Sequence, residues 1–154
     1  MATASDLDSA TDSSWDWVAE QTRTYLASGG HEGHENDGVR MLVLATTGRR
    51  SGTPRRTCLI YGTAGPDFVV VGSKAGEDED PDWFKNLVAE PRVGVQVGTR
   101  RFTGKAREAT PAERGPLWQQ MVEIFPLYRE YEQKTARQIP IVVISNEDGA
   151  LAHE

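Results

Sequence analysis

Apolar and polar positions recur along the chain with two different periods, and these periods predict helices and strands. Over residues 14–28 the apolar positions return every three to four residues, the spacing of one helix face, and Gly29 and Gly30 follow as a stop signal. Six other runs are short, apolar or alternating, and bounded by turn-forming residues, as is typical of strands. They cover residues 40–47, 55–63, 68–73, 92–99, 100–109 and 139–144.

Further helices are predicted between these strands. The segment PDWFKNLVAE, residues 81–90, begins with a proline suited to a first helical turn, and its spacing predicts that Trp83, Leu87 and Val88 point inward. Residues 110–113 have the Thr-x-x-Glu spacing of a capping box, in which side chains and backbone N–H groups satisfy one another. That helix is expected to break near Pro126, because proline lacks an N–H and clashes with the preceding turn. A second short helix, LYREYEQKT, follows the break.

This order of elements predicts a mainly β or α+β fold. Six strands in short antiparallel runs, with three or four peripheral helices, favour a small β-barrel. A doubly wound sheet would need a helix between nearly all strands, and the pattern does not provide them. A chain of 154 residues suits one domain. We expect a disordered tail over residues 1–13, a barrel domain over 14–145 and a polar tail over 146–154.

Composition narrows the classes of function. No apolar run approaches the roughly 18 residues of a membrane span. The opening residues are acidic and rich in serine and threonine, and Cys58 is the single cysteine, so we expect a cytoplasmic protein. The formal net charge of -6 weighs against a general nucleic-acid binder, which needs a broad basic face. The charge is uneven, however, because residues 40–56 carry five arginines and no acid, whereas residues 76–82 carry five acids and no base.

The arginine-rich stretch TTGRRSGTPRR, residues 46–56, is the strongest candidate for chemistry. Arg49, Arg50 and Arg55 can converge on one anion with planar guanidinium donors, helped by backbone N–H groups of a glycine turn. A phosphate site is favoured by this pattern over a solvated hairpin tip and over a nucleic-acid contact. Lys74 supports the small-ligand interpretation, because it follows a predicted strand between glycines and returns to the level of Arg55 if the two strands pair.

Two other groups of residues carry weaker signals. His31 and His34 lie three residues apart among glycines, so we interpret the stretch as a mobile loop rather than a metal site. Cys58 lies in the middle of a predicted strand without a local histidine, which favours a packed or site-lining cysteine over a catalytic thiol. The aromatics at positions 125, 128 and 131 either pack a helix or form the wall of a site for a planar ligand.

Taken together, the motifs resemble those of the deazaflavin-dependent nitroreductase family, which occurs chiefly in actinobacteria. The segments LATTGRRSGTPRRTCLIYG, VVVGSKAGEDEDPDWFKNLVAEPRVGVQVG and LWQQMVEIFPLYREYEQKTARQIPIVVI carry the resemblance over residues 40–145. It implies a split β-barrel similar to flavin mononucleotide-binding oxidoreductases. It also implies a small-molecule acceptor, such as a quinone, nitroaromatic, or conjugated enone or lactone, that takes a hydride from reduced coenzyme F-420, an 8-hydroxy-5-deazaflavin.

The resemblance also implies three groups of site residues. One holds the cofactor's phosphate and glutamyl tail, the second lies along its ring or makes polar and backbone contacts, and the third is an aromatic substrate wall. In that order they are Arg49, Arg50, Arg55 and Lys74; Cys58, Leu59, Ile60, Gly72, Ser73 and Asn86; and Phe125, Tyr128 and Tyr131. Tyr128 or Ser73 would supply or relay the proton. Family members can have proline at position 58 and tyrosines at 60 and 125, which makes the acceptor harder to infer than the cofactor.

Three alternatives remain at this stage: a flavin mononucleotide enzyme of the same fold, a deazaflavin carrier without catalysis, and a nucleic-acid module. Arg56 is expected to face away from the site and to be solvated. The N-terminal helix, with Trp15 and Trp17, is expected to cap the substrate pocket, pack on the barrel, or contact a membrane surface if the acceptor is a lipid quinone. Nothing in the sequence indicates the oligomeric state.

Overall fold

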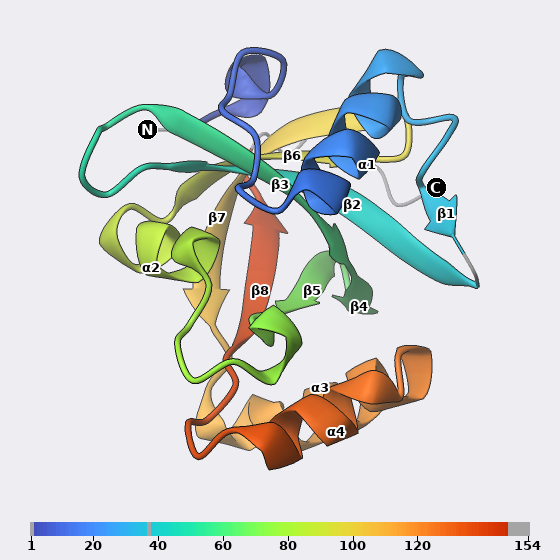
Figure 1. The fold of residues 1–154 in the computed structure, drawn as a ribbon, viewed down its shortest axis with the longest axis vertical. Helices are drawn as coiled ribbons and strands as arrows, with labels where there is room; N and C mark the ends of the chain where they lie inside the picture. The colour runs from blue at the N-terminus through green and yellow to red at the C-terminus, as the bar shows by residue number, and fades with distance from the viewer. Residues whose placement is uncertain (1, 37, 148–154) are drawn as a thin grey trace.

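One curled antiparallel sheet forms the centre of the molecule in this computed structural model, which describes residues 2–36 and 38–147 (Figure 1). Within these residues the sheet has eight strands in the order β1-β2-β6-β7-β8-β5-β4, with β3 also paired to β2. The strands are β1 Glu35–Asn36, β2 Val39–Thr47, β3 Pro54–Ile60, β4 Gly62–Ala64, β5 Asp67–Val71, β6 Arg92–Val97, β7 Arg100–Glu108 and β8 Ile141–Asn146. The helices are α1 Asp16–Ala27, α2 Asp82–Ala89, α3 Pro111–Ile124 and α4 Leu127–Lys134, with short 3-10 turns η1 Ala4–Asp6 and η2 Lys74–Gly76.

The prediction of a mainly β barrel with peripheral helices is confirmed. All six expected strands are present, and the expected run over residues 55–63 is divided at Tyr61 into β3 and β4. The capping box forms as expected, with the Glu113 N–H 3.3 Å from Thr110 Oγ1 and the Thr110 N–H 2.8 Å from Glu113 Oε1. The chain breaks between α3 and α4 at Phe125 and Pro126, where proline prevents continuation of the helix.

Both faces of the sheet are covered, which explains why its strands are almost continuously apolar. On β2, Leu42 and Leu44 point into the barrel core, whereas Val43 and Ala45 pack under the N-terminal segment and α1. On β5, Phe68 and Val70 face the same core, and their neighbours pack against α3 and α4. Figure 1 shows α1 lying over the β2–β3 hairpin and the α3–α4 pair at the opposite end of the molecule.

The prediction of a disordered tail over residues 1–13 is wrong for the described part of that segment. Leu7 is completely buried and packs under the sheet, in the same apolar cluster as Val43. Thr11 bridges to the β3 backbone: its N–H donates to the Pro54 carbonyl at 2.9 Å, and its carbonyl accepts from the Arg56 N–H at 2.8 Å. The segment is therefore an extra layer on the outside of β3. The predicted C-terminal tail lies outside the described residues from position 148 onward.

Two further side chains differ from expectation. Val88 is 64% exposed rather than inward, because Phe84 and Leu87 occupy the buried face of α2. Arg56 turns toward the N-terminal segment and is not solvated: its side chain is 12% exposed and donates to Asp12 and to the Leu7 carbonyl. The spacing of apolar residues within α2 predicted that Val88 is buried, but it does not show which side of the helix meets the barrel. The partners of Arg56 are distant in the sequence, so no local pattern identifies them.

Residues 29–34 form turns, as expected of a loop, and one of the two histidines is held in place. Nε2 of His34 lies 2.8 Å from the Tyr61 hydroxyl, and the two rings stack. Burial lowers the pKa of His34, and the nearby Arg40 lowers it further. Over residues 2–36 and 38–147, no three His, Cys, Asp or Glu side chains come together in a way that could hold a metal ion.

Candidate active site

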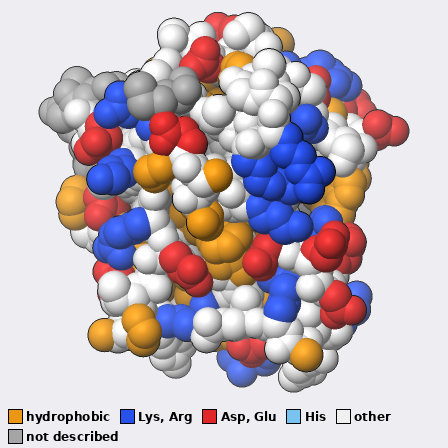
Figure 2. All heavy atoms as spheres, turned by 90° about the vertical axis from the view of Figure 1, so that its left-hand side faces the viewer, with side chains coloured by type: hydrophobic (Ala, Val, Ile, Leu, Met, Phe, Trp, Pro, Cys, Tyr) orange, Lys and Arg blue, Asp and Glu red, His pale blue; other side chains and the backbone are white. Residues whose placement is uncertain are grey.

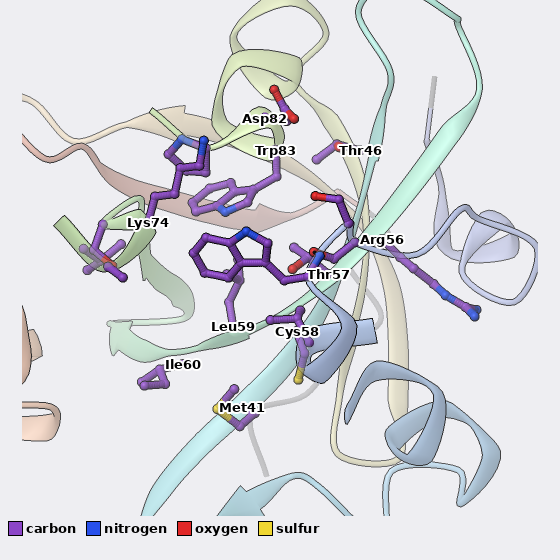
Figure 3. A pocket seen from close by; sticks show the side chains of 18 of the residues that line it. Met41, Thr46, Arg56, Thr57, Cys58, Leu59, Ile60, Lys74, Asp82 and Trp83 are labelled. Carbon is purple, nitrogen blue, oxygen red and sulfur yellow. Dashed lines mark hydrogen bonds between the residues drawn. The ribbon is translucent and has the colours of Figure 1, made fainter. Parts of the chain in front are cut away.

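A cavity of about 250 Å³ lies between β3, the start of α1, η2, α2 and α4 (Figure 3). On the face shown in Figure 2, Lys and Arg side chains gather beside a hollow that contains hydrophobic side chains. The cavity is lined by Ser13, Ser14, Trp15, Trp17, Val18, Met41, Thr46, residues 55–60, Val71, residues 73–75, residues 81–83, Asn86, Phe125, Tyr128 and Tyr131. Ten of the thirteen site residues expected from the sequence are among them; Arg49, Arg50 and Gly72 are not.

The cavity follows β3, so its polarity changes along that strand. Thr46 pairs with Arg55 at one end of the β2–β3 ladder, and Met41 pairs with Ile60 at the other. Five residues of strand separate these ends by roughly 17 Å. Figure 3 shows Thr46 and Asp82 toward one end of the cavity and Met41 and Ile60 toward the other. The cavity therefore has a cationic end and an apolar end.

Arg55 is the free cation of the cationic end. Its guanidinium lines the cavity and has no hydrogen bond or ion pair among the residues that the structure describes. Lys74 is only loosely paired, with Nζ 4.0 Å from a carboxylate oxygen of Glu77 and 4.0 Å from one of Glu79. Both acids are more than half exposed, so water screens these pairs and they contribute little. Two cations are thus available to an anionic ligand.

Arg49 is engaged within the protein instead. Its backbone N–H and its Nη1 both donate to Asn86 Oδ1, at 3.1 and 2.9 Å, and its Nη2 lies 3.3 Å from Asp82 Oδ1. Asn86 is buried, and its Nδ2 donates to Thr46 Oγ1 at 3.2 Å. The Asn86 amide therefore fixes the arginine turn against α2, with one N–H left for a ligand. Arg50 is exposed and lies outside the cavity lining.

Lys74 is held in an unusual backbone conformation. Lys74 has φ +46° and Ala75 has φ +54°, both in the left-handed region, which costs a non-glycine residue about 1–2 kcal/mol. Gly76 continues the turn at φ +80°. An added Cβ at Gly76 would lie 2.9 Å from the Tyr131 carbonyl oxygen, so glycine is required there for close packing against α4. Strained turns of this kind are found where a site needs a fixed geometry.

The middle of the cavity is lined by β3 itself. Cys58 packs with Met41 and Val43 on the α1 side of the sheet, whereas Leu59 contacts the barrel core. Burial raises the pKa of the Cys58 thiol to about 12, so it stays protonated and is a poor nucleophile at neutral pH. This supports the interpretation of Cys58 as a site-lining residue.

Three aromatic side chains close the apolar end. The rings of Phe125 and Tyr128 meet edge to face with their centroids 5.0 Å apart, and Tyr131 lies 6.3 Å from each of them. Burial raises the pKa of Tyr128, so its hydroxyl remains protonated. That hydroxyl forms no hydrogen bond with any described part of the chain. It is a donor without an internal acceptor at the wall of the cavity.

The sequence profile of a family described as F420H(2)-dependent quinone reductase matches residues 17–146. The chain belongs to this family. One relative, an F420H(2)-dependent quinone reductase of Mycobacterium tuberculosis, is 36% identical over 125 residues, which cover 79% of this chain and 84% of that protein.

Solved structures agree with this assignment to the quinone reductase family. A structure described as a domain-swapped dimer is 34% identical, covers 86% of this chain and 100% of its own, and superposes with a TM-score of 0.66. The F420-H2 dependent reductase FDR-A is 35% identical over 68% of this chain and 93% of its own, with a TM-score of 0.63. The expected resemblance and the split-barrel fold are thereby confirmed.

In this member of the quinone reductase family, the cavity is also lined by residues that were not expected from the sequence. Ser13, Ser14, Trp15, Trp17 and Val18 line the cavity, whereas Tyr25 on the same helix is buried against the barrel, so the position of the N-terminal helix fits both packing on the barrel and capping of the pocket. Trp83 was expected in the core, but it stands at the cavity between core and ligand space. The signal for these residues was their size and aromatic character, which does not distinguish a core position from a cavity wall.

Proposed function

We propose that the chain transfers a hydride from reduced coenzyme F-420 to a quinone. The observation that carries this proposal is the cavity that joins a cationic end at Arg55 to an aromatic end at Tyr128. A ligand with a phosphate at one end and a planar ring further along fits that division, as does a planar apolar acceptor beside the ring. Family membership supports the same activity.

The residues at the cationic end fit the cofactor's phosphate. Arg55 is a planar donor without a partner among the described side chains, and Lys74 is a second cation that lines the same cavity. Arg50 is exposed and forms no ion pair within the described residues, so it is available to the acidic glutamyl tail. Arg49 acts through the turn that it shares with Asn86, and we propose for it a structural role beside the tail.

The ring system would lie along β3, where Cys58, Leu59 and Ile60 provide an apolar wall. When bound, the reduced deazaflavin supplies a hydride, which is the hard part of the chemistry. The protein's contribution is to exclude water and to place a flat acceptor near the ring. Trp15 and Trp83 enclose the cavity from α1 and α2, and the aromatic wall encloses it from α4.

Tyr128 is our candidate for the group that meets the acceptor's oxygen. A quinone that gains a hydride becomes a hydroquinone only when a proton also arrives. The Tyr128 hydroxyl keeps its proton at neutral pH and can donate a hydrogen bond to the oxygen where negative charge develops. Because its raised pKa makes it a weak acid, we propose that Tyr128 stabilises this charge and that the proton itself arrives through water or Ser73, which also lines the cavity.

The decisive experiment mixes the purified protein with reduced coenzyme F-420 and a soluble quinone, and follows the return of oxidised deazaflavin absorbance. Parallel reactions replace the quinone with a nitroaromatic or a conjugated enone, which ranks the acceptor classes. Fast oxidation with quinone supports the proposal. Binding of the cofactor without acceptor-dependent oxidation would identify a carrier, and tight binding of flavin mononucleotide with none of F-420 would identify a flavin enzyme.

We further propose that the protein lies in the cytoplasm and makes a peripheral contact with the membrane surface. None of the helices in the described ranges is long and apolar enough to cross a membrane. Trp17 is 65% exposed and lines the cavity, which provides an apolar contact where a lipid-soluble acceptor would enter. Sedimentation with neutral lipid vesicles tests this, with Trp17→Ser expected to reduce binding. Equal sedimentation of both proteins would contradict it.

A further inference from the structure

Arg137 lies between α4 and β8, outside the cavity lining, yet its guanidinium is almost fully engaged. Its Nε donates to the Glu77 carbonyl at 2.8 Å, and its Nη2 donates to the Ser73 carbonyl at 2.7 Å. Its Nη1 donates to the Gly72 carbonyl at 3.2 Å and to Asp80 Oδ1 at 2.8 Å. The side chain is only 14% exposed. One side chain thus holds the backbone on both sides of η2.

These contacts determine which way two N–H groups point. The described peptides contain no cis bond, and in a trans peptide the C=O and the N–H point in opposite directions. The Gly72 carbonyl shares its peptide with the Ser73 N–H, and the Ser73 carbonyl shares its peptide with the Lys74 N–H. Because Arg137 draws both carbonyls to itself, both N–H groups are directed to the opposite side. Neither N–H has an acceptor among the described residues.

The backbone around these N–H groups has the form of an anion cradle. Ser73 is in the right-handed helical region, with φ -74° and ψ -36°, and Lys74 follows in the left-handed region. Successive N–H groups in such a pair converge on a concave site that binds anions. Lys74 and Ala75 avoid this conformation unless the surroundings impose it. The four hydrogen bonds of Arg137 add to that constraint, alongside the backbone hydrogen bond from the Gly76 N–H to the Ser73 carbonyl.

We propose that Arg137 is a positioning residue, which aims the Ser73 and Lys74 N–H groups at the anionic end of the bound ligand without touching it. The inference rests on the proposed function only in that it takes the anion to be the phosphate of coenzyme F-420. A lysine at position 137 keeps the charge but lacks the planar fork that reaches three carbonyls at once. The role therefore belongs to the shape of the guanidinium and not to its charge.

The test compares wild type, Arg137→Gln and Arg137→Lys, with Arg107→Gln as a matched control. Arg107 pairs with Glu113 at the start of α3 and does not line the cavity, so its loss removes the same charge. Each protein is titrated with coenzyme F-420 and with the phosphate-free core 8-hydroxy-5-deazariboflavin. We expect both Arg137 variants to bind F-420 roughly tenfold more weakly, from two misdirected charge-assisted bonds, and to bind the core as wild type does.

A second measurement needs no ligand. Amide hydrogen exchange of residues 72–77 is expected to be faster in Arg137→Gln than in wild type or Arg107→Gln. Unchanged exchange there, full recovery of F-420 affinity in Arg137→Lys, or equal weakening for both ligands would each overturn the positioning role. If wild type binds neither ligand, the proposed function fails as well, whereas wild-type binding with an unaffected Arg137→Gln overturns this inference alone.

Discussion

Nε of Arg56 lies 2.6 Å from Oδ1 of Asp12, and this ion pair fastens the N-terminal segment to β3. The same guanidinium also donates to the Leu7 carbonyl at 2.9 Å, so it spans the segment. Ser13, Ser14 and Trp15, the three residues after Asp12, line the cavity. A largely buried ion pair thereby holds one wall of the candidate active site in place.

Replacement of Arg56 by alanine is expected to lower the free energy of unfolding by about 2 kcal/mol, because it leaves Asp12 and two backbone carbonyls without a nearly buried donor. Arg23→Ala is the control, since Arg23 also pairs with Asp12 but is 56% exposed, and should cost under about 0.5 kcal/mol. Denaturant titration measures both. Equal losses would show that Arg56 is no more important than an ordinary surface cation.

The attachment of the segment is expected to withstand acid down to about pH 4. Burial acts to raise the pKa of Asp12, but the hydrogen bonds from Arg56 and Arg23 outweigh it, so the pKa lies below its ordinary value of 3.8. A lowered pKa contributes stability that is present above the unfolded-state pKa and is lost as the pH falls through the folded-state value. Limited proteolysis at residues 2–13 should therefore rise only below about pH 4. Release between pH 5 and 7 would contradict this assignment.

Arg55→Ala is expected to weaken binding of coenzyme F-420 by tenfold or more, because a charge-assisted hydrogen bond contributes about 1.5–3 kcal/mol. Arg50→Ala is the matched control from the same turn: Arg50 lies outside the cavity lining, and its exposed charge should be worth about threefold or less. Titration of each variant with the cofactor gives the two affinities. Unchanged affinity in Arg55→Ala would remove this residue from the phosphate site.

Tyr128→Phe is expected to lower turnover with a quinone by about tenfold while cofactor affinity stays the same. Because the hydroxyl has no hydrogen-bond partner in the described structure, its removal should leave the melting temperature unchanged or slightly raised. Since burial raises the pKa of Tyr128, wild-type turnover should show no titration of this group across neutral pH. Steady-state kinetics against pH provide the measurement, and unchanged turnover would exclude the proposed role.

Gly30→Ala is expected to destabilise the fold by more than about 3 kcal/mol. Gly30 has φ +89°, and an added Cβ would lie 1.7 Å from the Gly98 carbonyl oxygen, in the turn between β6 and β7. Gly29→Ala is the control, because Gly29 is also left-handed at φ +66° but has no atom within 4 Å of an added Cβ, and should cost about 1 kcal/mol. Thermal unfolding distinguishes them. Similar losses would show that α1 tolerates displacement from the barrel.

The barrel could be predicted because each strand carries its own evidence. β5 is apolar from Phe68 to Val71 since both of its faces are buried there, and the glycine and proline turns mark where such strands end. The N-terminal segment could not be predicted in this way. Leu7 is a lone apolar residue without a period, and the arginine that binds its carbonyl is 49 positions away in the sequence. Local patterns do not contain such a pairing.

The candidate site shows the same limit. The sequence contains a cluster of arginines but does not show which of them is available to bind a ligand. Availability depends on which acid or amide lies beside each arginine in the folded chain. Arg49 is engaged by Asp82 and Asn86, 33 and 37 positions later, whereas the guanidinium of Arg55 has no such partner in the described ranges. Arg137 was overlooked because its partners are mostly backbone carbonyls, which every sequence has and no side-chain pattern marks.

The position of β8 has a consequence for the order of events in synthesis. It is the last strand among the residues that the structure describes, yet it lies in the sheet between β5 and β7 and pairs with both. While residues 141–146 are still inside the ribosome, the edges of β5 and β7 that pair with β8 have no partner strand. Closure of the barrel is therefore a late step, after α4 has emerged, and the open edges are exposed to a second nascent chain throughout that interval.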